Sequence, residues 1–443
     1  MPEAGKTEPT AATKQIGRTT QRADLALRIV PWLVAALCLV PILVNLPEFR
    51  KLLYFGDDWD QLSQMDALGF ARWASRPFAE NTVPLYKTLW GGSILAFHGS
   101  YLAVLSVEWL THALSIGLLG GIMRRLGFTI STIAVAMLFF GLPASNIETL
   151  AWSVQLSPLL AAFFMLLAWR ILVSILDTPD GLPRLKLLLY VLVLIASALS
   201  FSRGLLSGIV FALFVLLYRP SPAPARTRRI VLVISLALPF ILGCVVNPPR
   251  LLARPGVNFA AAFVFGVHYL LLNPFFQIAG FAIVGWGAVC VFGLAKLSVT
   301  SMGFADTRKP PQIAFLAALL FLDLMNAVLL GYGRYHTGLP ASVSSRYQYV
   351  PLLCAAPFIG VVFARLFPSW NSGKMARLAA VSAVLALYAL LAWPWNAQIS
   401  AWSGWRGTAV RAALASAPPE ERIAFSLTSV ARARELQAKY NLH

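Results

Sequence analysis

Apolar residues in this chain fall in long blocks separated by short polar connections. The blocks approach the length that an α-helix needs to cross a hydrocarbon core of about 30 Å, and they lack the short alternation typical of exposed strands. The pattern therefore predicts an all-α polytopic membrane protein with about eleven transmembrane helices. The predicted spans are 29–46, 100–123, 129–143, 156–176, 187–201, 204–218, 230–246, 275–295, 313–331, 350–366 and 376–393.

One further apolar stretch, 259–272, is followed at once by Asn273 and Pro274. Counting it as a span would place the basic connections around Lys309 and Lys374 outside the cell, although Lys and Arg are normally enriched in cytoplasmic loops. We therefore interpret 259–272 as a re-entrant or interfacial segment. On this interpretation the protein is a multi-pass inner (plasma) membrane protein of bacterial type with its N-terminus in the cytoplasm.

The predicted topology divides the chain into three parts. Residues 1–28 form a cytoplasmic N-terminal tail, and residues 29–393 form the transmembrane domain, which includes a long external loop with short helices at 47–99. Residues 394–443 form an external amphipathic tail, which is basic and interrupted by Pro418 and Pro419. We expect this tail to form short helices on the bilayer surface.

Composition agrees with this class and excludes several others. The chain is 58% apolar and 12% charged, with a net charge of +18. The basic residues are spread over short connections rather than gathered on one face, so we predict no nucleic-acid partner. The sequence has no phosphate-binding Gly-Lys-Ser/Thr loop, no G-x-S-x-G motif and no Cys/His metal cluster, so nucleotide hydrolysis is not its energy source.

The first external loop is locally acidic. Asp57 and Asp58 are adjacent, and four further acidic residues lie close by in the sequence (Glu48, Asp60, Asp66 and Glu80). Neighbouring carboxylates repel each other, so one of the pair can act as a general base, or the two together can hold a divalent cation such as Mg²⁺ or Mn²⁺. A solvated, Asp-rich turn is the simpler alternative.

A second external connection combines an acid with an aromatic ring. Glu148 and Trp152 lie in the short turn between two predicted spans. An aromatic face can stack on a sugar ring while a carboxylate accepts its hydroxyl protons, so both are candidate substrate-binding residues. Interfacial tryptophans without any ligand are equally common at membrane surfaces.

Three arginines break the expected charge topology. Arg203, Arg334 and Arg346 lie at membrane depth or in external loops, and Tyr347 follows the last of them. An arginine near lipid needs an anion, and its planar fork matches a phosphate, so a lipid phosphate is the natural ligand. They could instead reach lipid headgroups or pair with carboxylates of the first loop.

Three ionisable residues lie inside predicted spans: Glu108, His112 and Asp323. Glu108 and His112 are four residues apart, on one face of a helix. Such groups are often functional in a bilayer, but here we favour a structural role in which each is satisfied within the helix bundle.

The order of these features resembles that of a known family. An acidic external loop with an Asp-Asp pair, the stretch Pro84–Trp90, a His in the second span, Arg124–Gly127 and Glu148–Trp152 follow one another as in the polytopic GT-C glycosyltransferases. The resemblance is closest to the protein O-mannosyltransferases and the bacterial lipid-A aminoarabinose transferases. It is clearest over residues 50–205.

The resemblance implies a GT-C-like fold and an inverting membrane glycosyltransferase. Its donor would be a sugar on a polyprenyl-phosphate carrier, its acceptor a lipid, glycan or protein hydroxyl, and its active site would lie at the external, periplasmic face. Asp57 or Asp58 would be the general base, Glu148 would assist substrate binding, and Arg203 or Arg346 would hold the carrier phosphate. Some family members also use a divalent metal.

Two other interpretations remain open from the sequence. A non-enzymatic flippase or transporter of lipid-linked sugars would use the ionisable groups inside the spans instead of the loop carboxylates. A structural subunit of an envelope polysaccharide system would leave the loop acids scattered and fully solvated.

Overall fold

The computed structural model describes residues 29–77, 82–179, 182–219, 221–246, 256–280, 286–307, 309–367 and 374–443. The predicted cytoplasmic tail 1–28 and Glu80 of the acidic loop lie outside the described residues. Within the described ranges the chain is helical, with no strand and a single isolated bridge between Arg422 and Ser429. The predicted all-α class is confirmed.

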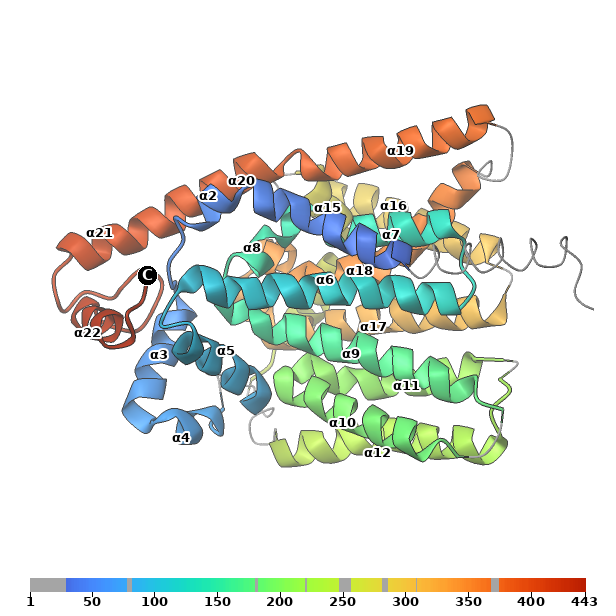
Figure 1. The fold of residues 1–443 in the computed structure, drawn as a ribbon, viewed down its shortest axis with the longest axis horizontal. Helices are drawn as coiled ribbons and strands as arrows, with labels where there is room; N and C mark the ends of the chain where they lie inside the picture. Colours follow the sequence, from blue (N-terminus) through green and yellow to red (C-terminus); the bar gives the residue numbers. More distant parts are fainter. Residues whose placement is uncertain are drawn as a thin grey trace, which may run out of the picture.

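Most of the long helices lie side by side as one bundle (Figure 1). By length and composition, seven helices of the described chain could cross a membrane, or eight if the bent pair Ile130–Gly141 and Ala144–Leu150 is one span. Three further apolar helices are shorter: Ile29–Val44, Ser202–Leu217 and Phe259–Leu272. The multi-pass character is therefore clear, whereas the number eleven stays a prediction.

The main helices of the bundle are α6 (Tyr101–Arg125), α7 (Ile130–Gly141), α9 (Leu156–Leu176), α10 (Arg184–Ser200), α11 (Leu206–Leu217), α12 (Ala225–Val246), α16 (Trp286–Asp306), α17 (Pro310–Arg334), α18 (Tyr349–Leu366) and α19 (Lys374–Ala392).

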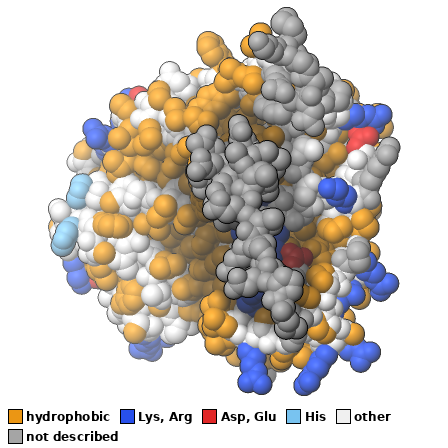
Figure 2. Space-filling view, turned by 45° about the vertical axis from the view of Figure 1, so that its right-hand side comes forward, with side chains coloured by type: hydrophobic (Ala, Val, Ile, Leu, Met, Phe, Trp, Pro, Cys, Tyr) orange, Lys and Arg blue, Asp and Glu red, His pale blue; other side chains and the backbone are white. Residues whose placement is uncertain are grey.

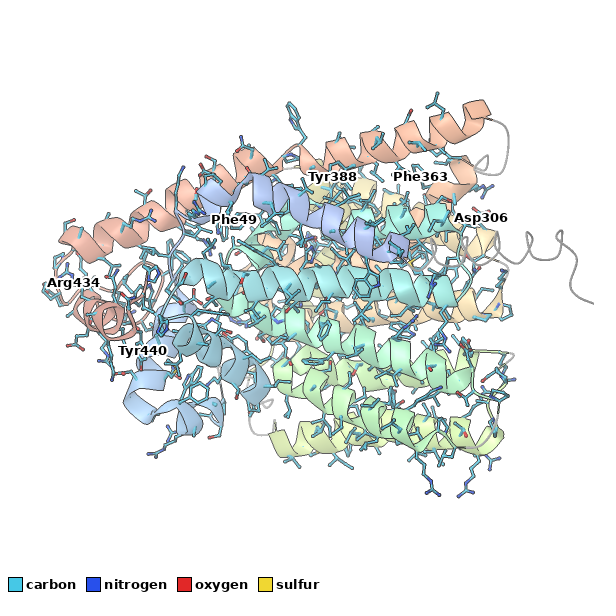
Figure 3. The ribbon with its side chains drawn as sticks, in the orientation of Figure 1. Phe49, Asp306, Phe363, Tyr388, Arg434 and Tyr440 are labelled. Carbon is cyan, nitrogen blue, oxygen red and sulfur yellow. The ribbon has the colours of Figure 1, made fainter. Side chains whose placement is uncertain are left out.

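The two ends of the bundle differ in their chemistry. We call the left end in Figure 1 the acidic end because it carries the acidic helix α3 (Asp57–Leu68). The same end carries α4 (Phe70–Ala74), α5 (Pro84–Ala96), α21 (Thr408–Ser416) and α22 (Val430–Tyr440). The opposite, basic end carries the connections after α6, α9, α11, α16 and α18. Figure 2 brings the basic end forward and shows many more Lys and Arg than Asp and Glu side chains on that face. In Figure 3, Asp306 lies at the basic end and Tyr440 at the acidic end.

Small residues set the close approach of several helices. A Cβ added to Gly208 of α11 would collide with the backbone of Ser235 in α12, and one added to Gly331 of α17 would collide with the carbonyl of Ala262. In a bilayer the hydrophobic effect does not drive helices together, because lipid tails are as apolar as the side chains. Small residues let two helices approach closely and gain van der Waals contact instead. The glycines therefore serve packing rather than chemistry.

The predicted span 275–295 is wrong in its position. The structure instead has a short helix α15 (Phe275–Ala279) and then α16, which runs on to Asp306. Lys296 marked the end of the apolar block, but its ammonium is buried and pairs with Asp323 at 2.5 Å while donating to the carbonyl of Asn273 at 2.9 Å. Hydropathy counts Lys296 as a charge that ends a span, whereas the fold neutralises it inside the bundle.

Helix α14 (Phe259–Leu272) covers only part of its neighbour α17. Its two ends lie beside Tyr335, whose hydroxyl accepts from the Asn258 backbone at 3.2 Å, and beside Lys296, which bonds to the Leu270 carbonyl and to Asp323. The helix thus reaches from the acidic end to the middle of α17. This depth is compatible with the re-entrant interpretation of 259–272.

The C-terminal segment differs from the expected surface helices. Helix α19 continues directly into α20 (Trp395–Trp402), a π-helical turn at Ser403–Gly407 and α21. Residues 378–416 therefore form one long helical run. The chain then turns back, and α22 packs on α3 (Figure 1). The buried apolar residues of this part of the chain are Ile423 in the turn before α22, and Val430, Ala433 and Leu436 in α22 itself. The tail is part of the acidic end because its apolar face covers the first loop.

Candidate active site

The first loop enters α3 through a tight turn at Gly56. Its φ of +56° is a backbone conformation that glycine adopts at no steric cost. A Cβ at this position would also lie 3.4 Å from the ring of Trp152 and 3.5 Å from the carbonyl of Phe425. Gly56 thus brings the start of α3 against two distant segments and fixes the direction of Asp57 and Asp58.

Asp58 points into the protein. It is 0% exposed, accepts a hydrogen bond from the Phe55 backbone at 3.0 Å, and accepts another from Ser153 Oγ at 2.7 Å. Ser153 Oγ in turn accepts from Trp90 Nε1 at 2.9 Å. Both carboxylate oxygens are therefore engaged with the protein, and Asp58 joins α3 to the connection between α8 (Ile147–Leu150) and α9.

Burial of Asp58 has a consequence for the pH dependence of stability. Desolvation raises the pKa of Asp58 from 3.8 to about 7, against the opposing effect of its two hydrogen bonds. Because the folded state holds this proton more tightly than the unfolded state, the stability that Asp58 contributes is complete below pH 4 and is lost as the pH rises to about 7. The Asp58→Asn variant has no carboxyl group at this position, so its free energy of unfolding should not show this decrease between pH 4 and about pH 7.

The measurement is the free energy of unfolding in detergent micelles between pH 4 and pH 8, taken as the difference between the wild type and Asp58→Asn. The difference removes the effects of other carboxylates such as Asp66, whose pKa falls to about 2, mainly through its bond with Lys439. A difference that does not vary with pH would show that Asp58 is ionised throughout.

Asp57 has a different environment, although it is the next residue along the chain. It is partly exposed, and no hydrogen bond or ion pair joins its carboxylate to the rest of the described residues. Burial and the charge of Asp60 raise its pKa, while the positive charges of Arg346 and Arg334 oppose the rise. Asp57 is therefore the member of the pair whose carboxylate has no protein donor in the described chain, and so remains available.

Glu148 connects three segments at the base of the site. It accepts hydrogen bonds from the hydroxyl of Ser345 and from the Arg346 backbone at 3.0 Å, and it pairs with Arg406 Nη2 at 3.3 Å. Glu148 and Arg406 are both buried. Its oxygens are occupied by protein donors, so Glu148 holds the Arg346 loop in place rather than standing open for a sugar.

Trp152 is also buried rather than exposed as a platform. Its Nε1 donates to the Phe55 carbonyl at 3.0 Å, and its ring lies 4.8 Å from the guanidinium carbon of Arg406. The same guanidinium lies 4.1 Å from the ring of Phe55 and 3.4 Å from that of Trp402. Trp152 thus belongs to an aromatic enclosure around Arg406.

Two of the three predicted arginines, Arg346 and Arg334, lie within electrostatic range of Asp57, and the third, Arg203, lies within range of Arg334. Arg346 lies over the ring of Tyr347 at 5.1 Å, and its Nε is buried without a hydrogen-bond partner in the described chain. Arg203 is 9% exposed, its guanidinium lies over the ring of Phe201 at 5.4 Å without a side-chain hydrogen bond to any described residue, and it lies within electrostatic range of Arg334 and Tyr347. Positive charge held this way in a partly dry site favours an anionic ligand.

Three residues of this arrangement were missed as site residues by the sequence reasoning: Ser153, Ser345 and Arg406. A single serine carries no recognisable sequence pattern, because its role depends on which distant side chains it hydrogen-bonds to. Arg406 had one signal, because a basic residue stands among Trp402 and Trp405, a composition that favours cation–π contacts.

No metal ligand set is assigned. Among the described residues, no three His, Cys, Asp or Glu side chains converge. Asp57 and Asp58 point into different surroundings, so the pair does not form the two-oxygen chelate considered from the sequence.

The ionisable groups inside the spans do not line a common path. Asp323 pairs with Lys296, and His112 bonds through its two ring nitrogens to the Tyr349 hydroxyl and the Gly141 carbonyl, each at 3.1 Å. Glu108 is fully buried, and no side chain among the described residues bonds to it. These separate, enclosed positions give no support to a transport route.

Comparison with known proteins identifies the fold. No family model matches the sequence, and no curated protein matches it either. The solved structures include the Archaeoglobus fulgidus oligosaccharyltransferase in its apo form, with a TM-score of 0.52, 12% identity and coverage of 95% of this chain and 59% of the other. The same enzyme tethered to an acceptor peptide gives a TM-score of 0.50, with the same identity and coverage.

A third structure of this archaeal enzyme, with an inhibitory peptide and a dolichol-phosphate, gives a TM-score of 0.48. The chain spans about 59% of the length of the oligosaccharyltransferase it matches. At 12% identity the likeness concerns the fold. Since oligosaccharyltransferase is a membrane glycosyltransferase of the GT-C superfamily, the GT-C-like fold expected from the sequence is confirmed.

Proposed function

We propose that this protein is a GT-C type membrane glycosyltransferase that moves a sugar from a polyprenyl-phosphate carrier to an acceptor hydroxyl. The observation that carries the proposal is that Asp57, an available carboxylate, lies within electrostatic range of Arg346, whose Nε is buried without a hydrogen-bond partner in the described chain. Arg203, which is buried, lies within electrostatic range of Arg334, the second arginine near Asp57. The fold likeness to a membrane glycosyltransferase supports the same conclusion.

In the proposed reaction the Asp57 carboxylate and the arginine guanidinium groups have different roles. Asp57 accepts the proton of the acceptor hydroxyl while the oxygen attacks the anomeric carbon, and the bond from that carbon to the phosphate oxygen breaks. The phosphate leaves with the bonding electrons, and Arg203, Arg334 and Arg346 stabilise its charge. Attack opposite the leaving group inverts the anomeric configuration.

An apolar groove that reaches the end of α17 carrying Arg334 suits the carrier tail. It lies between α14 and α17, has a volume of about 310 Å³ and ends at Tyr332, two residues before Arg334. Its lining consists of Phe259, Ala262, Phe263, Gly266, Val267, Leu270, Leu324, Ala327, Val328 and Tyr332. An isoprenoid chain in this groove would bring its terminal phosphate towards the guanidinium groups.

The proposed orientation follows from the distribution of charge. The basic end, with Arg124 and Arg125 in the last turn of α6, would face the cytoplasm of a bacterial-type cell, and the acidic end with Asp57 would face the periplasm. A carrier-linked donor and an acceptor would then meet at the external membrane surface.

The test of this function is binding of a polyprenyl phosphate to the purified protein in nanodiscs, compared with the matching polyprenol. We expect the wild type to bind the phosphate at least tenfold more tightly than the alcohol, because buried guanidinium groups gain a charge-assisted bond. Arg203→Met should remove most of this preference.

Arg170→Met is the matched control, since Arg170 is also partly buried but bonds to the Gly121 carbonyl near the basic end. It should keep the wild-type preference. Equal binding of the phosphate and the alcohol by the wild type would refute the role given to the arginines and, with it, the proposed donor.

A further inference from the structure

Residues 422–429 form a tight turn that presents apolar side chains to solvent. The Ile423 backbone donates to the Thr428 carbonyl at 2.9 Å, closing the turn. Phe425 at its tip is 68% exposed and Leu427 is 74% exposed. Phe425 has a φ of +57°, a left-handed conformation that is unfavourable for a bulky residue. Contacts within the chain cover only part of this ring, and most of its surface faces outward.

The turn is fixed to the helix that carries Asp57. Asp60 of α3 accepts hydrogen bonds from Ser426 Oγ at 2.7 Å, from the backbone of Leu427 and Thr428 at 3.0 Å each, and from Thr428 Oγ1 at 2.9 Å. Asp60 lies three residues after Asp57. The exposed ring of Phe425 therefore has a defined position relative to the available carboxylate.

A second exposed aromatic side chain lies against the first. The ring of Trp405 is 5.3 Å from that of Phe425, at an angle of 70°, and Phe55 is 5.3 Å from Phe425 on another side. Trp405 is 52% exposed and belongs to the π-helical turn at Ser403–Gly407, a rare geometry that is frequent at functional sites. We call the exposed pair Phe425 and Trp405 the aromatic patch.

The aromatic patch adjoins the start of α3. The Cβ of Phe425 lies 4.0 Å from the position that a Cβ on Gly56 would occupy, and Gly56 directly precedes Asp57. A molecule stacked on the patch would therefore lie beside the first turn of α3, which carries Asp57.

The surroundings of the patch favour water over lipid. Glu420, Glu421 and Arg422 at the base of the turn are exposed, as are Glu435 and Lys439 on the outer face of α22. Charged side chains of this density are costly in a bilayer. The described chain also has no strand whose edge could pair with an extended peptide.

We propose that the aromatic patch is an acceptor subsite that stacks a sugar ring, so that the acceptor is a glycan. This inference rests on the proposed function, because it uses Asp57 as the base that the acceptor hydroxyl must reach. Aromatic faces beside a carboxylate provide the combination that binds a saccharide: apolar contact with the C–H face and acceptors for the hydroxyls.

The test is saccharide binding in the absence of donor, measured by saturation-transfer NMR on the full-length protein in detergent. The probes are maltohexaose, chitohexaose and mannohexaose. We expect at least one to bind the wild type, with at least tenfold weaker binding to Phe425→Gly. Glycine suits the positive φ, so this variant removes the ring and relieves the backbone strain.

Two control variants accompany this test. Phe425→Trp keeps an aromatic ring and should retain binding. Trp393→Ala removes an 86% exposed ring outside the patch and should bind like the wild type.

Absence of binding by all three saccharides, or equal binding by Phe425→Gly, would overturn the proposal. It would also be overturned if a fluorophore on Leu427→Cys were quenched by spin-labelled phosphatidylcholine in nanodiscs, because the turn would then lie in the bilayer as a membrane anchor. Since no donor is present, these outcomes are independent of the donor-binding test of the transferase itself.

Discussion

Asp57→Asn is expected to abolish sugar transfer while leaving the protein folded. The substitution keeps the size of the side chain and removes its ability to accept a proton, and a positioned general base contributes about 10²- to 10⁴-fold to the rate. The measurement is transfer from a polyprenyl-phosphate-linked sugar in proteoliposomes. We expect kcat to fall by about 10²- to 10⁴-fold with an unchanged unfolding transition.

Asp58→Asn is the matched control. Its amide can donate to Ser153 Oγ and its carbonyl can accept from the Phe55 backbone, so both contacts of the buried side chain have a replacement. We expect transfer to fall by less than about tenfold, because Asp58 is too buried to meet an acceptor. Full activity of Asp57→Asn, or a loss confined to Asp58→Asn, would show that the base has been misassigned.

Arg406→Met is expected to cause the largest loss of stability among single substitutions at the acidic end. It leaves Glu148 buried without its cation, and breaking a buried pair from one side costs about 3–5 kcal/mol. The loss should appear in equilibrium unfolding monitored in detergent micelles. Lys51→Met is the matched control, because its pair with Glu48 is exposed and should contribute less than about 1 kcal/mol.

The double variant Arg406→Met/Glu148→Gln separates the charge from the packing. With the carboxylate gone, no uncompensated charge remains, so the double variant should be more stable than Arg406→Met alone. If the two substitutions lower stability additively, the arginine acts through its aromatic contacts and not through Glu148.

The structure also explains why two neighbouring aspartates differ. In the sequence, Asp57 and Asp58 are equivalent members of an acidic loop. Residues one apart on a helix point about 100° from each other, so one faces the Ser153 connection and the other faces the arginines. Which direction is inside depends on the segment 144–155, nearly a hundred residues away in the sequence, and no local pattern contains that information.

The same limit applies to Glu148 and Trp152. The sequence places an acid and an aromatic ring at one turn, which predicts a sugar site. In the fold both are turned inward around Arg406, which comes from beyond the last predicted span. An exposed aromatic pair exists nearby, but it is Phe425 and Trp405 of the C-terminal segment.

The sequence alone determined the class of this protein and pointed to Asp57, Asp58 and Arg346 as candidate site residues. Long apolar blocks must be helices in a bilayer, because lipid offers no partner for backbone polar groups, and this constraint acts on each segment separately. The tertiary structure decided which charges are neutralised, as for Lys296 beside Asp323, and which remain available, as for Asp57. Burial and pairing depend on segments distant in the chain, so they exist only once the helices have packed.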